Sequence, residues 1–290
     1  MNKYKILICV AVIAIAAFLL YFVIPDKAAG FQDYSTIVLD ENKEILRVFL
    51  NKSEQWCFPP DPEMEIPSKL ETAVLQYEDR YFYYHPGVNP FALLRALFLN
   101  IKHRIIISGG STLTMQVARL TDPKSRTIPN KIYEILQAFK LELKYSKKDI
   151  LKLYLDHAPY GRNIIGIQAA SRKYYYKEPQ NLTWSEAATL AVLPNSPGLI
   201  SPGKNQQRLI NKRNRLLGKL FKKKIIDEET LELSLLEPVP NTVHTFPISA
   251  PHISQYLKSK NRENIIKTTL NCGKQQQLEQ ILEQHSDFLQ

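Results

Sequence analysis

An uncharged, apolar run near the N-terminus constrains this chain more than any other feature. Residues Ile6 to Ile24 contain no charged side chain and almost none that is polar. A helix of that length is long enough to cross the hydrocarbon core of a bilayer. Lys3 and Lys5 precede the run, and positive residues at the end of a span favour the cytoplasmic side. The chain after Pro25 is therefore expected outside the cytoplasm.

A cleaved signal peptide is the alternative reading of this run. The apolar core of a signal peptide usually has ~7–15 residues, fewer than the run has here, and residues 26–30 (DKAAG) offer only a weak cleavage site. We expect an uncleaved, single-pass anchor in the cytoplasmic membrane, with 1–5 as a cytoplasmic tail, 6–24 as the span and the rest of the chain on the outer, periplasmic face. Both alternatives place the body of the chain outside the cytoplasm.

The chain is basic, with a formal net charge of +10 over 290 residues. This balance favours acidic partners such as nucleic acid, anionic lipid or a pyrophosphate substrate. The expected compartment argues against nucleic acid, although residues 205–225 form a strongly basic predicted helix. The three cysteines, Cys9, Cys57 and Cys272, have no zinc-site spacing. A disulfide between the last two remains open.

The remaining chain divides into three parts by its pattern. Residues 25–54 are predicted to be a short β-rich connector, in which 35–50 form two strands around an Asp-Glu-Asn turn. Residues 55–236 form the predicted main domain, which is mainly α-helical. Residues 237–290 are predicted to contain short strands and a helix at 274–288. This last part is interpreted as a linker.

Several helix starts can be predicted from local signals. In a capping box, a Ser or Thr cap and an acidic residue three positions later bond each other's backbone. Three pairs have this spacing: Ser68 with Glu71, Ser146 with Asp149, and Thr183 with Glu186. A further helix is expected to open at Ser111, after two glycines, and another to begin at Phe91 and run with an apolar tail to Ile107.

Two adjacent carboxylates are the first candidates for chemistry. Glu78 and Asp79 follow an apolar predicted helix and precede an aromatic cluster at 81–84. A carboxylate held among aromatic rings loses solvation, which raises its pKa and suits a general base or acid near neutral pH. The plainer alternative is a solvated helix end with an ion pair between Asp79 and Arg80.

Two further segments carry polar groups with a pattern that suits phosphate. Residues 109–116 (GGSTLTMQ) place small residues and hydroxyls at a predicted helix start, where free backbone N–H groups attract anions. On the next helix, Lys131, Glu134 and Glu142 share one face. The plainer alternatives are a glycine turn with a serine cap and a surface ion pair, which contributes little stability.

In their order along the chain, these segments resemble the successive motifs of the peptidoglycan glycosyltransferases, glycosyltransferase family 51. Residues 78–87 match E-D-x-x-F-x-x-H-x-G, and residues 109–116 match G-G-S-T-L-T-x-Q. The third motif, R-K-x-x-E, is matched except that Asn130 stands where the family has Arg. A fourth motif follows from Lys148, with Asp156 in place of the usual Asn.

A fifth motif begins at Glu186, so the resemblance extends over about 130 residues. Within the family, residues 114–119 (TMQVAR) and the short Pro-rich tail look most like the 1C type of penicillin-binding protein. The resemblance implies a lysozyme-like helical fold with a small membrane-proximal jaw, which would be Phe91 to Ile107. It also implies that residues 237–290 are a linker into a transpeptidase domain that is absent or truncated.

The resemblance also implies a reaction. Members of the family polymerise lipid II, joining a lipid-linked glycan chain to it with inversion and release of undecaprenyl diphosphate. By motif, Glu78 would be the catalytic base. Glu134 would be the second catalytic carboxylate, acting on the pyrophosphate either directly or through a divalent metal ion, Mg²⁺ or Mn²⁺. The implied partners are lipid II, the lipid-linked glycan chain, membrane lipids and other cell-wall synthesis proteins.

The remaining predicted site residues are those that would bind the substrate. They are Asp79, Ser111, Thr112, Gln116, Arg119, Arg126 and Lys131. Asn130 removes one cation beside the pyrophosphate, which predicts reduced or redistributed affinity. His85 is expected to be a structural hydrogen-bonding residue and not a ligand.

Two other functions compete with glycan synthesis. A lysozyme-like lytic enzyme needs one acid on a helical scaffold, but it has no use for the cationic, hydroxyl-rich second and third motifs. A catalytically impaired, membrane-anchored remnant is supported by Asn130 and the short tail. Nucleic-acid binding through Lys222, Lys223 and Lys224 would require a different compartment.

Overall fold

The computed structural model of the chain describes residues 33–103, 109–195, 198 and 202–288. The predicted membrane span at 6–24 lies outside these residues. Within the described part of the chain, no helix is both long enough and apolar enough to span a bilayer.

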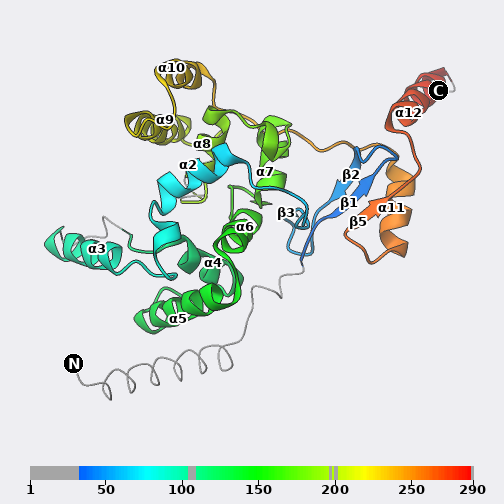
Figure 1. Cartoon of the computed structure of the whole chain (residues 1–290). Helices are drawn as coiled ribbons and strands as arrows, with labels where there is room; N and C mark the ends of the chain where they lie inside the picture. The colour runs from blue at the N-terminus through cyan, green and yellow to red at the C-terminus, as the bar shows by residue number, and fades with distance from the viewer. Residues whose placement is uncertain (1–32, 104–108, 196–197, 199–201, 289–290) are drawn as a thin grey trace.

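The main body of the molecule is a bundle of α-helices (Figure 1). In chain order its helices are α2 (Ser68–Glu78), α3 (Pro90–His103), α4 (Leu113–Thr121), α5 (Ile128–Lys144), α6 (Lys147–His157), α7 (Ile167–Tyr175), α8 (Trp184–Val192), α9 (Gln206–Lys222) and α10 (Glu228–Leu236). Short 3₁₀ turns lie at Phe82–Tyr84 and Pro179–Asn181. The prediction of a mainly α-helical domain is confirmed.

The core of this bundle joins segments that are far apart in the sequence. Helix α2 packs on α8, α8 packs on α9, and α4 lies between α5 and α6. Large buried side chains fill the centre, among them Leu70, Leu113 and Tyr154. Burial of such apolar groups is the main favourable contribution to folding. This packing places the C-terminal end of α2 next to the N-terminal end of α4, and predicted site residues lie at both ends.

A small sheet stands beside the bundle. Strand β1 (Thr36–Leu39) pairs antiparallel with β2 (Ile45–Phe49) and parallel with β5 (Ile265–Lys267). The two strands predicted within 35–50 are therefore confirmed. Pairing with β5 brings both ends of the described chain into one sheet, where α11 (Pro251–Lys260) packs against β2 and α12 (Cys272–Phe288) follows (Figure 1).

The interior of the molecule also contains a two-stranded pairing of β3 (Trp56–Cys57) with β4 (Ile164–Ile165). Cys57 is buried in it, and burial raises the pKa of its thiol to about 12. Cys57 and Cys272 are both free thiols. The disulfide that the sequence left open is therefore not formed.

The capping predictions are confirmed at two of the three helices. Ser146 with Asp149 and Thr183 with Glu186 form complete capping boxes at the starts of α6 and α8. The prediction for Ser68 is wrong, because Pro67 takes the cap position of α2 and no side chain caps it. The other half of that predicted pair, Glu71, instead accepts a hydrogen bond from the Tyr83 hydroxyl at 2.6 Å.

The start of α4 also differs from the prediction by one residue. Thr112, not Ser111, is its cap, and the Thr112 hydroxyl accepts a hydrogen bond from the backbone N–H of Met115. Helix α3 begins at Pro90, and the apolar tail predicted at 104–107 lies outside the described residues.

Candidate active site

One cavity of about 930 Å³ collects most of the predicted site residues. Its walls come from the C-terminal end of α2, from α4, from α5 and from α6. The predicted residues that line it are Glu78, Ser111, Gln116, Arg119, Arg126, Lys131 and Glu134. The fold therefore brings both predicted catalytic carboxylates and three cations into a single chamber.

Glu78 is the last residue of α2 and has two different oxygen environments. Its Oε2 accepts a hydrogen bond from the Gln116 side-chain amide at 2.8 Å. Its Oε1 is buried without a hydrogen-bond partner among the described residues. Burial is the largest influence and raises the pKa of Glu78, while the Gln116 hydrogen bond and the charges of Lys212 and Arg119 oppose it. A carboxyl group in this environment is suited to accept a proton near neutral pH.

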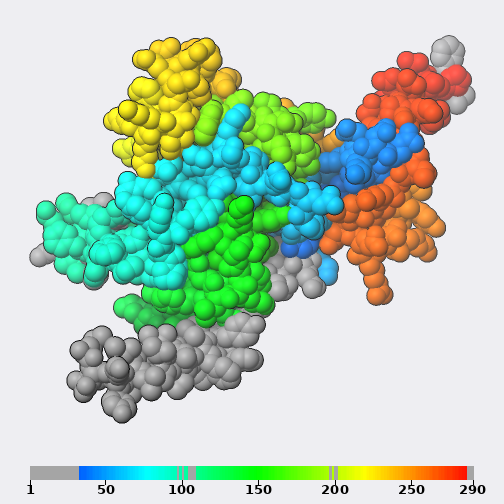
Figure 2. Space-filling view, viewed as in Figure 1, coloured from blue at the N-terminus to red at the C-terminus, as the bar shows by residue number. Residues whose placement is uncertain are grey.

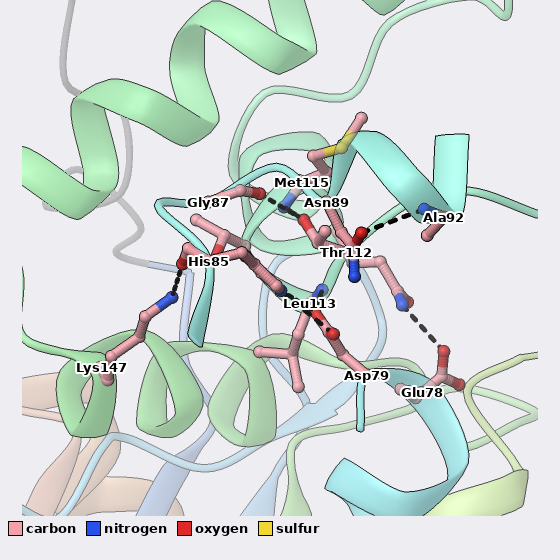
Figure 3. Close-up of polar contacts among 12 residues, drawn as sticks. Glu78, Asp79, His85, Gly87, Asn89, Ala92, Thr112, Leu113, Met115 and Lys147 are labelled. Carbon is pink, nitrogen blue, oxygen red and sulfur yellow. Dashed lines mark hydrogen bonds and ion pairs between the residues drawn. The ribbon is translucent and has the colours of Figure 1, made fainter. Parts of the chain in front are cut away.

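Asp79 does not line the cavity, although we predicted that it binds substrate. It is buried behind Glu78, where its Oδ2 accepts hydrogen bonds from the backbone N–H of Leu113 and from His85 Nε2, each at 2.9 Å (Figure 3). Asp79 therefore joins the end of α2 to the start of α4, which is a positioning role, and its part in substrate binding stays a prediction. His85 has the structural hydrogen-bonding place that was expected of it.

Thr112 likewise supports the site from behind. It caps α4 through the N–H of Met115, and its hydroxyl donates to the Gly87 carbonyl (Figure 3). Gly87 has φ +84°, and a Cβ at this position would lie 2.8 Å from Glu142 Cγ. Only glycine combines this backbone conformation with so close an approach. Thr112 therefore has a structural role at the start of α4, and its part in substrate binding stays a prediction.

Lys131 connects the second motif to the third. Its Nζ donates to Ser111 Oγ at 2.6 Å and to Glu134 Oε1 at 2.7 Å. A cation, a hydroxyl and a carboxylate thus meet on one wall of the cavity. Beside them, the Asn130 side-chain amide donates to the backbone carbonyl of Ser125 at 2.9 Å and secures the turn that precedes α5.

Glu142 was expected on the same polar face as Lys131 and Glu134, but it does not line the cavity. Its Oε1 accepts hydrogen bonds from the Thr114 hydroxyl and from Lys147 Nζ at 2.8 Å. The helical face continues along α5, but at Glu142 it contacts Thr114 of α4 and Lys147 of α6 instead of the cavity. Helical spacing alone could not locate that change of environment.

Sequence reasoning missed several residues that surround the site. Lys124 lines the cavity and its Nζ lies 3.3 Å from the ring centroid of Tyr133, a cation–π contact. Tyr154 lines the cavity with a buried hydroxyl that has no hydrogen-bond partner among the described residues. Lys212 comes from α9 and acts on the charge of Glu78. Tyr154 lies inside the fourth motif segment, whereas Lys124 falls between the second and third motifs and no local signal connected Lys212 to Glu78.

Asp156 departs from the family pattern and lies in an unusual environment. It is buried near the C-terminal end of α6 and does not line the cavity. Burial raises the pKa of its carboxyl group to about 6, while the charge of Lys152 opposes the shift. A neutral Asn, the usual residue here, would avoid the cost of burying a charge.

With this geometry, the class of the protein can be stated. The chain belongs to the transglycosylase family, whose family model, described as Transglycosylase, matches residues 42–221. It is 40% identical over 245 residues to penicillin-binding protein 1C of Escherichia coli K12, a match that covers 84% of this chain and 32% of the relative. It is 32% identical over 231 residues to penicillin-binding protein 1F of Bacillus subtilis, covering 75% and 31%.

A solved structure is also similar, that of penicillin-binding protein 1A from Haemophilus influenzae. The match has a TM-score of 0.41 at 20% identity and covers 84% of this chain and 28% of the other. At these values the superposition does not by itself establish a shared fold. The chain spans about a third of the length of the two curated relatives named above. The family resemblance seen in the motifs is confirmed by the family model and by the two curated relatives.

Proposed function

We propose that this chain is a peptidoglycan glycosyltransferase that polymerises lipid II into glycan strands. One observation carries the proposal: Glu78 and Glu134 line the same cavity, together with Arg119, Arg126 and Lys131. The membership in the transglycosylase family and the penicillin-binding relatives support the same activity.

In the proposed reaction, Glu78 is the general base. The 4-hydroxyl of the acceptor sugar attacks C1 of the donor sugar and gives its proton to the Glu78 carboxylate, while the bond from C1 to the pyrophosphate oxygen breaks. A base must be deprotonated at working pH yet basic enough to take the proton, and a raised pKa serves both needs. The Gln116 hydrogen bond to Oε2 holds the carboxylate in place. Because attack displaces the leaving group directly, the configuration at C1 inverts and no enzyme nucleophile is needed.

The leaving group is a lipid pyrophosphate, on which negative charge increases as the bond breaks. Fixed cations in a partly enclosed site stabilise such charge strongly. Lys131 is held between Ser111 and Glu134, so its ammonium group is positioned before the substrate arrives. Arg119 and Arg126 line the same cavity. We assign these three cations to the pyrophosphate, and we expect Asn130 to weaken that binding without abolishing it.

Exposed apolar side chains support a position at the membrane surface. On α3 they are Phe91, Leu94, Phe98 and Ile101, which recur on one helical face. Helix α5 also exposes Ile128 and Ile132. Apolar faces of this kind bury themselves in the interface of a bilayer. We propose that α3 is the membrane-proximal jaw, and that the chain works on the outer face of the cytoplasmic membrane, where its substrates are anchored.

A divalent metal ion stays a prediction. Mg²⁺ is usually held by one or two carboxylates together with substrate phosphates, and Glu134 is the carboxylate placed to provide this. Its Oε1 already accepts from Lys131, and the described residues contain no group of three or more His, Cys, Asp or Glu side chains suited to hold a metal. No step of the proposed reaction is assigned to a metal. Activity measured with EDTA and then with added Mg²⁺ or Mn²⁺ tests the requirement.

Product analysis tests the proposed function against a lytic enzyme. The purified protein would be incubated with labelled lipid-linked disaccharide-peptide in detergent or vesicles, and in parallel with isolated cell-wall sacculi. Longer glycan chains from the lipid-linked precursor are the expected result. Soluble fragments from sacculi without polymer would indicate the lytic reaction, and no product from either substrate would indicate a catalytically impaired remnant.

A further inference from the structure

Helix α9 carries a row of cations beside the cavity. Its members are Arg208, Lys212, Arg215, Lys219 and Lys223, the last being the residue that caps the C-terminus of the helix. Their spacing of three or four residues places them on one side of the helix. We call these five residues the cationic row. The proposed reaction makes no use of it.

Direct contacts hold the cationic row along the wall that contains Glu78. Lys219 Nζ donates to the backbone carbonyl of Gln76, and Lys223 Nζ donates to the Gln76 side chain at 2.7 Å. Gln76 lies two residues before Glu78 on α2. Nearer the other end of the row, Lys212 Nζ donates to Asn195 Oδ1 at 3.1 Å, and Asn195 lines the cavity. The row therefore borders the cavity at one end and continues outward along α2.

The charges of the cationic row repel one another. Burial is the largest cause that lowers the pKa of Lys212, and the charge of Arg208 adds to the effect. The pKa of Lys219 is lowered by burial and then by the charges of Lys223 and Arg80. Close cations that depress each other's pKa favour a bound anion, because the anion relieves their repulsion.

We propose that the cationic row binds the carboxylates of the peptide arms carried by the sugars that react at Glu78. This inference rests on the proposed function, in which both sugars meet at that carboxylate. A peptide arm extends away from its sugar and ends in a carboxylate, and a row of Lys and Arg side chains leading out of the cavity meets that charge with charge-assisted hydrogen bonds. Successive arms of a lengthening strand would find successive cations.

The position of α9 favours an anion carried by the glycan, and not an anionic lipid surface, as the ligand of the cationic row. Helix α9 lies on the opposite side of the bundle from α5, whose exposed apolar residues we assign to the membrane (Figure 1). In the space-filling view the yellow segment, which contains most of α9 together with α10, forms one extremity of the molecule, separate from the blue-green segment that contains α3 (Figure 2). A strand that lies along α9 would therefore be on the far side of the bundle from α5.

Comparing a substrate that carries the peptide with one that lacks it separates binding of the peptide from a general effect of charge. The double variant Arg208→Gln/Arg215→Gln removes two exposed members of the row and leaves Lys212 beside Glu78. The control, Lys222→Gln/Lys224→Gln, removes two charges at the end of the same helix and outside the row. We expect the first variant to raise KM about 3- to 10-fold for lipid-linked disaccharide-peptide, and to leave KM unchanged for the same lipid-linked disaccharide without a peptide. The control should behave as the unaltered protein does.

Equal changes of KM for both substrates, or no change for either, would overturn the inference. Weakened binding to vesicles of anionic lipid, with KM unchanged, would assign the row to a lipid surface instead. If the unaltered protein polymerises neither substrate, the proposed function fails, and direct binding of soluble disaccharide-peptide then decides the inference separately. In that case the row is supported only if the first variant weakens this binding while the control does not.

Discussion

At the scale of single residues, the site depends on where charge is buried. Glu78 is mostly enclosed and its pKa is raised by burial. Lys131, by contrast, keeps two polar partners, Ser111 and Glu134, within 2.7 Å. The first arrangement produces a base, and the second produces a cation fixed in place. The same chamber therefore contains both groups that the proposed reaction requires.

The raised pKa of Glu78 predicts the pH dependence of the reaction. Because the base acts only when deprotonated, kcat/KM should fall as pH decreases through the pKa of Glu78, and the midpoint should lie above the ordinary value of 4.5. A pH–rate profile of polymerisation with the unaltered protein measures it. A profile that stays flat down to pH 4.5 would contradict the raised pKa.

Asp156 makes a second prediction at this scale, on stability. Its pKa is about 6 in the folded chain against an ordinary 3.8, so its contribution to stability is present at low pH and is lost as pH rises through about 6. Asp156→Asn should therefore stabilise the protein at pH 8, by on the order of 2–3 kcal/mol. Near pH 4 the gain should be much smaller. Thermal unfolding of both proteins at the two pH values tests this, and an equal shift at both would contradict it.

At the scale of elements, the site is held by contacts between helix ends. The carboxylate of Asp79 joins the end of α2 to the first turn of α4 and to His85. Lys147 on α6 donates to the His85 carbonyl and to Glu142 on α5. Four helices thus meet behind Glu78, and a change there should move the base without touching the substrate.

Asp79→Asn tests this support. An amide cannot accept both hydrogen bonds with the strength of a carboxylate, so the variant should lose about 1–3 kcal/mol of stability. Its kcat should fall about tenfold or more, because small misplacements of a catalytic group are costly, whereas KM should change little. Asp149→Asn, which weakens the capping box of α6, is the matched control. A loss of stability in both variants with kcat unchanged in both would contradict the positioning role.

Local signals predicted some elements well and failed at others for identifiable reasons. The caps at Ser146 and Thr183 were predictable because a capping box is complete within four residues. The prediction at Ser68 failed because Tyr83, across a turn, recruits Glu71. Helix α11 was missed for a related reason, since its place depends on packing against β2.

The residues of the candidate site also fall into those that local sequence predicted and those that depend on tertiary packing. Motif residues identified the lining from Glu78 to Glu134, but not which of them face the cavity: Asp79 and Thr112 point into the support behind it. The contribution of Lys212 depends on α9 packing beside α2, which no local pattern encodes. Depth and direction of a side chain are tertiary properties.

At the scale of the whole molecule, the distribution of surface character suggests an orientation. Exposed apolar residues lie on α3 and α5, with others on α10, α11 and α12, whereas the cationic row lies on α9. The cavity lies among the helices that connect these two faces. We infer that lipid-linked substrates enter from the apolar side.

Replacing two of the apolar side chains tests this orientation. Phe91→Ser/Phe98→Ser changes two exposed rings on α3, so folding should be nearly unaffected while binding to lipid vesicles falls. Each exposed ring that enters the bilayer contributes on the order of 1.5–3 kcal/mol, and a loss of about tenfold or more in vesicle affinity is expected. Tyr176→Ser, at an exposed ring on the residue that follows α7, is the control. Co-sedimentation with vesicles measures the effect, and equal binding by all three proteins would contradict the assignment.

The account as a whole depends on Glu78 acting as the base of a synthetic reaction. The most direct measurement is glycan polymerisation from labelled lipid-linked disaccharide-peptide by Glu78→Gln, alongside binding of the same precursor. The amide keeps the size of the side chain but cannot take a proton, so polymerisation should fall at least ~100-fold while the precursor still binds. Polymerisation at the rate of the unaltered protein would contradict the account.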